Sequence, residues 1–426
     1  MTDGAARTLL DSGNQSLIDF AVPHLTTRNP DDFWTSGQWM TERTGGSDVG
    51  LSETTATIDA DKNWKLHGTK WFTSATTSEI ALALARPDKD IKGGKGLALF
   101  LVRVLDDDKS MSPGIQVNRL KDKLGTRKVP TAELTLDGAL ATPVQGLSNG
   151  VKNITPMLNV TRTWNAMASV WGMRRGIALA TSYAQKRFAF GSTLSQKPLH
   201  MSTLAHMIGE FNGAFVLAFK TAELLGKIDT KTARPEEIDL FRIIAPLAKL
   251  TTGKQAVSIA SETLEAFGGA GYIEDTGLPR LLADAQVLPI WEGTTNVLSM
   301  DVLRVLQKSP QSLTRLLEYP KTLNLEDAPN ALSVAIKALK DAQETTQHWV
   351  KEHSNNPRKL ESDARLFSLS LGRLMQLTLL IEHAISVNNQ KANPQRSIAA
   401  ANQFASHGVC QFRNNDMEVV SNLCGF

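Results

Sequence analysis

The chain has 426 residues, of which 42% are hydrophobic, and its formal net charge is +3 at pH 7. A chain of this length can form two or three domains around a large buried core. So small a net charge gives no reason in itself to expect a nucleic acid or an anionic membrane surface as partner.

The two cysteines, Cys410 and Cys424, lie near the C-terminus without the spacing of metal ligands. They support neither a disulfide framework nor a zinc site. No run of about 18 apolar residues predicts a membrane span, and the first residues resemble neither a secretory signal nor a transit peptide. We therefore expect a cytoplasmic protein in a reducing compartment.

Residues 37–145 are expected to form an antiparallel β domain. The short apolar runs in this region are bounded by Gly, Asp, Asn and Pro, which is typical of strands joined by turns. The expected strand regions are 55–75, 80–87, 96–105 and 131–139.

Residues 146–308 have apolar residues three and four apart, which predicts a helical bundle. A break at Ser309-Pro310 and a proline-containing stretch at 318–330 separate this bundle from a C-terminal helical extension over 309–426. The helices expected in the bundle cover 163–190, 201–225, 236–266 and 295–307. The apolar face expected in the extension consists of Phe367, Leu371, Leu374, Leu377 and Ile381.

Two segments of the β domain contain candidate binding residues. The first, from Met40 to Val49, includes Thr41, Gly46 and Ser47, and such a polar loop with paired glycines can bring backbone N–H groups and hydroxyls close to a flat ring and phosphates. In the second, Trp71 offers a stacking surface, and the hydroxyls of Thr73 and Ser74 follow it. Taken alone, these segments are also compatible with an ordinary turn and a buried tryptophan.

Two segments of the bundle complete the set. Arg187 and Phe190 follow a helix, and the planar guanidinium of an arginine suits a pyrophosphate, although a solvated arginine at a helix end is the simpler interpretation. Gly269 and Gly271 do not belong to a dinucleotide-binding fingerprint. The third glycine of that fingerprint is replaced by Glu274, and a helical pattern, not a strand, precedes the glycines. The candidate residues of the last segment are Glu265, Gly269, Glu292, Gly293, Thr294 and Asn296.

In this order, the four segments resemble the acyl-CoA dehydrogenase family. The resemblance implies FAD as cofactor, bound by the residues named above, with Arg187 and Phe190 reaching the FAD of a neighbouring subunit. It also implies that Glu292 removes the α-proton of an acyl-CoA thioester while flavin N5 accepts the β-hydride. A carboxylate in that role must be desolvated enough to be basic and must reach the α-carbon.

The implied fold is α+β and acyl-CoA dehydrogenase-like, with the β domain followed by the helical bundle and the extension. The match is best to the alkylation-response, AidB-type branch, whose members also have an extra C-terminal helical region. Residues 1–36 look like the last part of the family's N-terminal helical domain, so that the chain is expected to be N-terminally truncated. In relatives that domain helps to enclose the flavin, and its loss would expose apolar surface.

Two residues depart from the family pattern. Glu265 stands where many relatives have glutamine, which places a carboxylate near phosphate charge. Ala283 stands where relatives usually have arginine, so that whatever ion pair this arginine makes is missing.

Three functions follow from the resemblance. The leading one is an acyl-CoA dehydrogenase of fatty acid metabolism, which passes electrons to an unidentified acceptor and works as a homo-oligomer, a dimer or tetramer. An acyl-CoA oxidase would reoxidise the same flavin with oxygen. The third is a flavin-containing, DNA-associated or acyl-sequestering protein with little turnover, but residues 309–426 contain 12 Lys and Arg against 11 Asp and Glu, which disfavours DNA binding.

Overall fold

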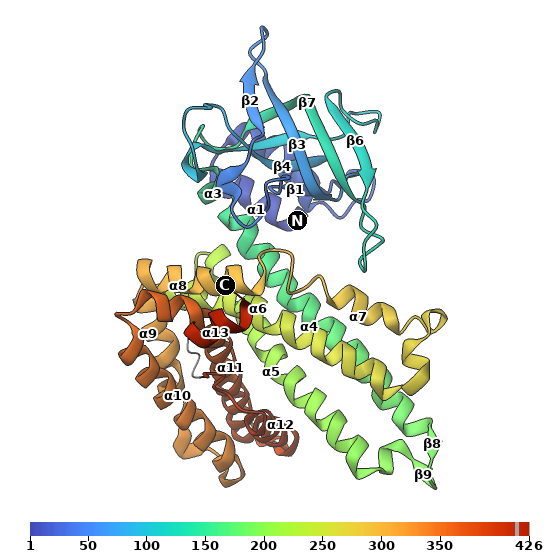
Figure 1. Cartoon of the computed structure of the whole chain (residues 1–426), viewed down its shortest axis with the longest axis vertical. Coiled ribbons are helices and arrows are strands. Elements are labelled where there is room, and N and C mark those ends of the chain that lie inside the picture. Colours follow the sequence, from blue (N-terminus) through green and yellow to red (C-terminus); the bar gives the residue numbers. More distant parts are fainter. Residues whose placement is uncertain (414–416, 426) are drawn as a thin grey trace. The chain divides into compact units, whose positions relative to one another are not determined.

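The computed structural model describes residues 1–413 and 417–425. It divides into two compact units, Met1–Thr161 and Arg162–Phe426, which we call the β unit and the helical unit (Figure 1). The long helix α4 (Thr155–Lys186) begins in the first unit and continues into the second.

The β unit contains one seven-stranded sheet with the order β1-β4-β5-β7-β3-β2, and β6 pairs with β7 beside this path. Neighbouring strands are antiparallel, except that β1 and β4 run parallel with Ser36 opposite Ile80. The strands are β1 (Ser36–Trp39), β2 (Thr55–Ile58), β3 (Trp64–Ser74), β4 (Ile80–Ala85), β5 (Ala98–Arg103), β6 (Ile115–Leu120) and β7 (Thr131–Pro143). The helices of this unit are α1 (Thr2–Ser12), α2 (Gln15–Thr26) and α3 (Gly150–Asn153).

Strand β4 is buried on both faces, and for this reason its sequence is apolar without interruption. Ile80, Leu82 and Leu84 pack in one cluster with residues of α1 and α2. The alternate residues, Ala81, Ala83 and Ala85, pack in a second cluster with β3, β5 and β7. The two helices therefore cover one face of β4, and the rest of the sheet covers the other.

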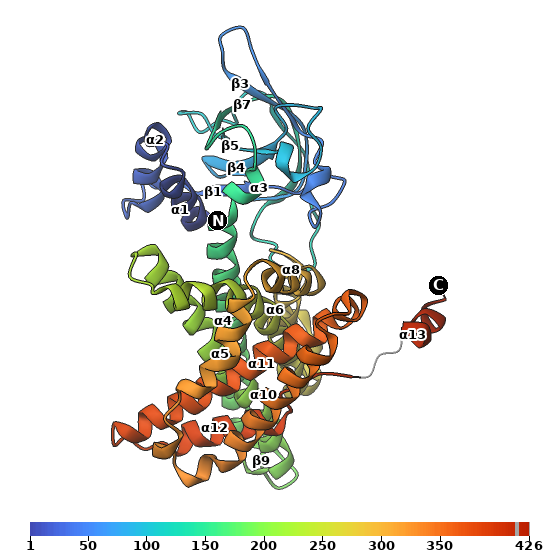
Figure 2. The same ribbon diagram turned by 90° about the vertical axis from the view of Figure 1, so that its left-hand side faces the viewer.

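The helical unit has a single core that runs from α4 to α12 and joins the bundle to the extension. Figure 2 shows α11 and α12 beside α5, and α11 contacts α5, α6, α8, α10 and α12. The helices are α5 (Pro198–Asp229), α6 (Pro235–Ala266), α7 (Pro279–Ala285), α8 (Thr295–Lys308), α9 (Gln311–Glu318), α10 (Ser333–His353), α11 (Pro357–Asn389), α12 (Gln395–Ser406) and α13 (Met417–Cys424).

The expected apolar face of the extension lies on α11, and its five residues are fully buried. One window of α11 has a mean hydropathy of 1.2, which is high enough for a membrane span by composition, but 78% of this window is buried inside the unit. The apolar stripe is therefore explained by packing in the core of the fold.

The expected strand regions contain strands and the expected helices are present, except that the helix expected at 163–190 ends at Lys186 and is followed by the strands β8 (Phe188–Ala189) and β9 (Ser192–Thr193). Other elements were missed. Strands β1 and β6 had not been expected, and the proline break at Ser309-Pro310 is followed directly by α9. Pro310 occupies the N-cap position of α9, where the missing N–H of a proline costs little. The predicted break is present, because α8 ends at Lys308 and α9 begins at Gln311, although α9 still packs against α6 of the bundle.

A buried polar network joins α5 and α6 to the extension. Arg373 of α11 donates two hydrogen bonds to the carboxylate of Glu210 on α5, at 2.9 and 3.0 Å. Gln255 of α6 donates to the same carboxylate at 2.8 Å, and His407 Nδ1 lies 2.8 Å from it. Burial would raise the pKa of Glu210, but the bonds with His407 and Arg373 outweigh it and hold this pKa below its usual range.

We expect Arg373→Met to destabilise the helical unit by about 3 to 5 kcal/mol, because Glu210 would stay buried without its bidentate partner. The free energy of unfolding from urea denaturation measures this loss. Arg396→Met is the matched control, since Arg396 is exposed and makes no ion pair among the described residues. An equal loss in both variants would contradict the prediction.

Candidate active site

The two predicted segments of the β unit lie side by side. The backbone N–H of Trp71 donates to the carbonyl of Thr41 at 2.9 Å. A Cβ atom on Gly46 would lie 2.5 Å from the Thr41 hydroxyl, so the turn is close-packed at this glycine. Met40 is partly buried and follows β1 directly, whereas Ser47 is exposed in the loop.

A buried ion pair, which sequence reasoning missed, anchors these two segments to each other. Lys70 is fully buried and donates to Glu42 and to the carbonyl of Leu84, both at 2.7 Å. Glu42 also accepts from the backbone N–H groups of Glu53 and Thr54. Burial would raise the pKa of Glu42, but the attraction of Lys70 and the hydrogen bonds hold it below its usual value.

A bulge in β3 turns Trp71 and Phe72 out of the regular hydrogen-bonding ladder with β7. The β3–β7 register shifts between Lys70 and Thr73, and Phe72, with φ of 53°, is 60% exposed. Thr73 is 2% exposed, and its hydroxyl has no hydrogen-bond partner among the described residues. The hydroxyl of Ser74 is instead 2.9 Å from that of Thr131.

These features fit a flat-ring cofactor such as FAD. The buried Thr73 hydroxyl needs a partner, since an unpaired buried hydroxyl is costly. Trp71, immediately before the bulge, is only partly buried and can offer a ring face. Of the hydroxyls expected to reach the ring edge, the geometry favours Thr73 over Ser74.

In the helical unit, Arg187 and Phe190 lie at and just beyond the end of α4. A hairpin of β8 (Phe188–Ala189) and β9 (Ser192–Thr193) has Phe190 and Gly191 at its tip, both with positive φ, as a two-residue turn requires. Phe190 is 95% exposed, and Arg187 is exposed without an ion pair among the described residues.

Glu265 and Gly269 lie on either side of Phe267, whose ring contacts that of Tyr183 near the end of α4, with centroids 4.5 Å apart. The loop after α6 is tight, and a Cβ atom on Gly271 would lie 1.9 Å from the Leu264 carbonyl oxygen. Gly269 is exposed, and a Cβ atom there would meet nothing within 4 Å. Its backbone is therefore open to a ligand.

Glu292 lies in a tight turn directly before α8. Glu292 and Gly293 have φ values of 57° and 98°, so that two successive residues are in left-handed conformations. Such a conformation is strained for a residue other than glycine and persists only when its surroundings impose it. Thr294 caps α8 by accepting from the N–H of Val297 at 3.3 Å.

Side chains from α4 and α11 hold the two ends of this turn. Asn165 donates to the Leu288 carbonyl at 3.2 Å and accepts from the indole N–H of Trp291. Arg365 of the extension donates to the side-chain oxygen of Asn296 at 3.0 Å. The motifs had not predicted Asn165 or Arg365, because both are far from the turn in sequence.

Lys249 of α6 holds the centre of the turn. It is fully buried and donates to the carbonyl of Gly293 at 2.6 Å. Burial lowers the pKa of Lys249 to about 7, Glu292 opposes this shift, and Arg162 adds to it. A lysine within the apolar stretch of α6 was the signal that could have identified it.

Within the helical unit, the predicted residues therefore form two separate groups. Glu292, Gly293, Thr294 and Asn296 lie beside Lys249, whereas Arg187, Phe190, Glu265 and Gly269 lie at the far end of α6. From Lys249 to Glu265 the helix rises by roughly 24 Å.

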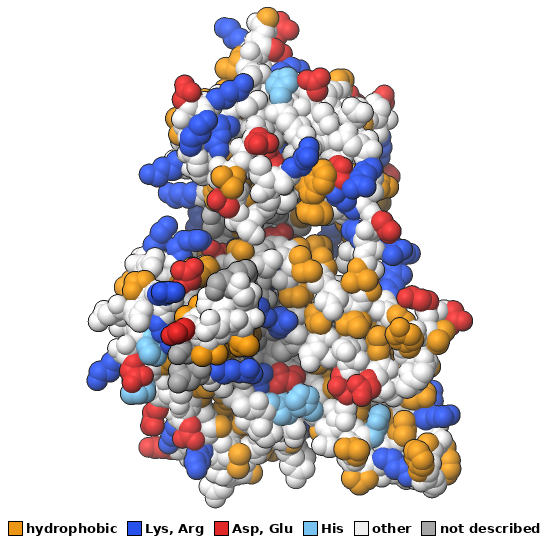
Figure 3. Space-filling model, viewed as in Figure 1, with side chains coloured by type: hydrophobic (Ala, Val, Ile, Leu, Met, Phe, Trp, Pro, Cys, Tyr) orange, Lys and Arg blue, Asp and Glu red, His pale blue; other side chains and the backbone are white. Residues whose placement is uncertain are grey.

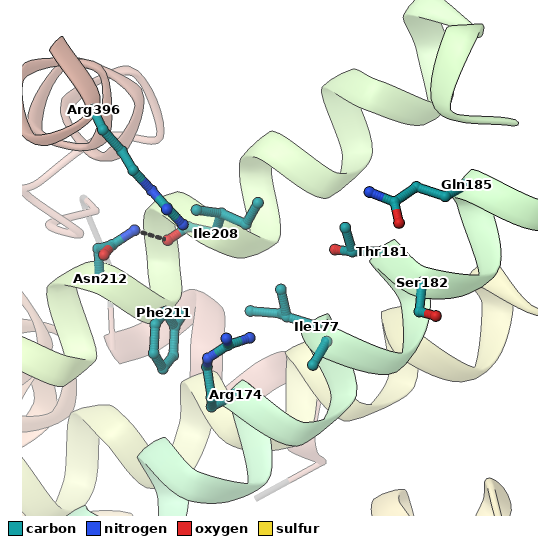
Figure 4. A pocket seen from close by; sticks show the side chains of 10 residues that line it. Arg174, Ile177, Thr181, Ser182, Gln185, Ile208, Phe211, Asn212 and Arg396 are labelled. Carbon is teal, nitrogen blue, oxygen red and sulfur yellow. Dashed lines mark hydrogen bonds between the residues drawn. The ribbon is translucent and has the colours of Figure 1, made fainter.

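A surface groove of about 370 Å³ lies between α4, α5 and α12 and contains none of the predicted residues. Figure 4 shows Arg174 and Arg396 at this groove, together with Phe211 and Asn212. Both arginines are exposed. Nor do the described residues include a group of three His, Cys, Asp or Glu side chains that could hold a metal ion.

Comparison with family models gives three matches along the chain. Residues 37–139 match the acyl-CoA dehydrogenase middle domain, and residues 148–307 match the acyl-CoA dehydrogenase C-terminal domain. Residues 317–422 match the acyl-CoA dehydrogenase 11 C-terminal domain-like family.

Two curated relatives extend this match. Acyl-CoA dehydrogenase family member 11 of Caenorhabditis elegans is 44% identical over 406 residues, which are 92% of this chain and 66% of that protein. The putative acyl-CoA dehydrogenase AidB of Escherichia coli is 34% identical over 72% of this chain and 56% of its own length. The chain thus spans slightly less than two thirds of the first relative and little more than half of the second.

Solved structures agree with this fold. The crystal structure of Caenorhabditis elegans ACDH-11 in complex with C11-CoA has a TM-score of 0.93 and 41% identity, covering 99% of this chain and 74% of that one. An acyl-CoA dehydrogenase complexed with FAD from Bacillus anthracis, 17% identical, has a TM-score of 0.76 over 93% of this chain and 69% of that one, and shows the same fold.

We expect the burial of Lys249 to make stability depend on pH. The pKa of Lys249 falls from 10.5 in the unfolded chain to about 7 in the fold. The free-energy cost of burying its charged amine is therefore complete below pH 7 and absent above pH 10.5. Between pH 7.5 and 9.5 the free energy of unfolding should therefore gain about 2 to 3 kcal/mol from this group.

Urea denaturation of Lys249→Met at the two pH values should lack this gain. Lys254→Met, which removes a partly exposed lysine of the same helix, is the control and should keep it. A pH dependence that is equal in wild type and Lys249→Met would show that Lys249 is not the group responsible.

Proposed function

Because the chain belongs to the acyl-CoA dehydrogenase family, whose cofactor is FAD, we propose that it removes two hydrogens from the α- and β-carbons of an acyl-CoA thioester. The observation that carries this proposal is the strained turn at Glu292, which side chains from three helices hold in place. A carboxylate that must abstract a proton from carbon requires this kind of fixed geometry.

In the proposed reaction the α-carbon loses its proton to a carboxylate oxygen of Glu292. The β-carbon loses a hydride, which bound FAD would accept, and a carbon–carbon double bond forms between them. Glu292 is only partly buried. Thr294, Gly293 and Asn296 would contact the cofactor from the same turn and the start of α8.

The residues of the β unit would hold the flavin ring. Trp71 would cover one ring face, and Thr73 would donate its unpartnered hydroxyl to the ring edge. Met40, Thr41, Gly46 and Ser47 would surround the ring and phosphates from the adjacent loop, and Ser74 would support them. The buried pair of Lys70 and Glu42 fixes the distance between the two segments.

Arg187, Phe190, Glu265 and Gly269 would bind the FAD of a second subunit. Their distance along α6 from Glu292 supports this assignment, and so do the exposed apolar side chains around them. Phe188, Phe190 and Leu199 are 65%, 95% and 83% exposed, and Figure 3 shows hydrophobic side chains at this end of the helical unit. We therefore propose a homo-oligomer, in which a neighbour covers this surface.

We propose that the chain belongs to a branch of the family that includes AidB and acyl-CoA dehydrogenase 11. The support is the C-terminal extension, which matches the acyl-CoA dehydrogenase 11 C-terminal domain-like family. The Caenorhabditis elegans structure was solved with C11-CoA. We propose a saturated acyl-CoA as substrate, with C11-CoA as the first compound to test.

The proposal predicts that C11-CoA, added without oxygen, bleaches the visible absorption of the bound flavin. Glu292→Gln should slow this bleaching by about 10² to 10⁴-fold, since it removes the base. Glu274→Gln, an exposed loop glutamate with the same change of charge, is the matched control. The rate of bleaching in a stopped-flow spectrometer measures the effect.

Three other outcomes would contradict parts of this proposal. If the protein binds FAD and C11-CoA without bleaching, an acyl-sequestering role replaces the proposed dehydrogenation. If Glu292→Gln and Glu274→Gln bleach at the wild-type rate, Glu292 is not the base. Hydrogen peroxide formation in air at the rate of turnover would identify an oxidase.

A further inference from the structure

Lys249 lies where an apolar residue would be expected. Its neighbours in α6, Leu247, Ala248 and Leu250, are completely buried, and so is Lys249 itself. Burial of a charged amine is unfavourable unless a specific partner compensates for it. A lysine at this position therefore calls for a role that a leucine or methionine could not fill.

The partner of Lys249 is the backbone of the turn at Glu292. Its ammonium nitrogen lies 2.6 Å from the carbonyl oxygen of Gly293, the residue directly after the proposed base. An amine donates such a bond whether it is protonated or neutral, and 2.6 Å is a short distance for an N–H donor and a carbonyl oxygen. This bond fixes the peptide between Gly293 and Thr294, and with it one end of the left-handed turn that presents Glu292.

The charged groups around Lys249 are consistent with such a clamp. Glu292 attracts the ammonium, and Arg162 repels it. Arg162 is itself paired with Asp301 of α8, 3.0 Å away, so that its charge is partly balanced. The ammonium thus lies beside a carboxylate and a carbonyl that both belong to the same turn.

We propose that Lys249 is a positioning residue, which holds the Gly293 carbonyl and thereby keeps the Glu292 carboxylate aligned with the α-carbon of the substrate. The inference rests on the proposed function for the identity of the base. Lys249 itself does not exchange a proton with the substrate. Its effect on the reaction passes through the conformation of the turn.

The test compares Lys249→Met with Lys254→Met. Methionine has a similar length and suits the apolar surroundings, but it cannot donate a hydrogen bond. Stopped-flow mixing with C11-CoA without oxygen gives the rate constant for flavin bleaching and the apparent Kd for C11-CoA. Lys249→Met should lower the rate constant roughly 10- to 100-fold, as a misaligned group does, with full FAD content and a Kd within about threefold of wild type.

A second measurement does not depend on bleaching. Hydrogen–deuterium exchange of the purified FAD-bound protein reports how firmly the backbone of residues 290–296 is held. Exchange there should be faster in Lys249→Met than in wild type or Lys254→Met, while the rest of α6 stays protected. Loss of protection throughout the helical unit would instead show a structural role alone and would overturn the proposal.

The two measurements separate the possible failures. Wild-type rate and wild-type exchange in Lys249→Met would overturn the positioning role. A change in Kd with an unchanged rate constant would also overturn it, since Lys249 would then act on binding. If wild type itself never bleaches, the proposed function fails, and the exchange data alone decide whether Lys249 clamps the turn.

Discussion

The burial of α6 determines where the candidate residues of the helical unit can lie. Most of this helix is enclosed by α5, α8, α9 and α11, so its polar side chains must find partners inside the unit. Lys249 donates a hydrogen bond to the turn at Glu292, and Gln255 donates one to the carboxylate of Glu210. The end of the same helix leads into the glycine-rich loop. One buried helix thus positions the proposed base and separates it from the residues proposed to serve a second subunit.

Local patterns predicted most of the fold, and the missed elements lacked such patterns. The helices at 236–266 and 295–307 agree with α6 and α8 to within a residue at each end, because apolar periodicity persists over their whole length. Strand β6 has one buried residue followed by five exposed ones, so its sequence lacks the alternation of apolar and polar residues that would predict a strand. At Pro310 a break in the chain coincides with a helix start, and only the packing in the structure shows that α9 lies against α6.

The motifs located the candidate site, but they did not reveal what holds it. Glu292, Thr294 and Asn296 lie in one turn and its following helix, as their closeness in sequence required. Asn165, Lys249 and Arg365 contact this region from three other helices, and no local rule connects residues 44 to 126 positions apart. Arg365 also shows that the extension belongs to the site's support. It reaches the side chain of Asn296 from α11, whose core is continuous with the bundle.

Each unit anchors its candidate residues with a fully buried lysine, but the two lysines are satisfied differently. Lys70 meets a carboxylate and a carbonyl, so its charge is compensated within the β unit. Lys249 donates to a carbonyl, and the carboxylate that attracts it is that of the proposed base. An apolar side chain at either position would avoid the desolvation of an amine, and replacing buried ion pairs by apolar residues often stabilises a protein. What apolar packing cannot supply is a directed bond to one particular backbone oxygen. The two lysines are therefore best understood as residues that give up stability in exchange for the fixed geometry of two loops.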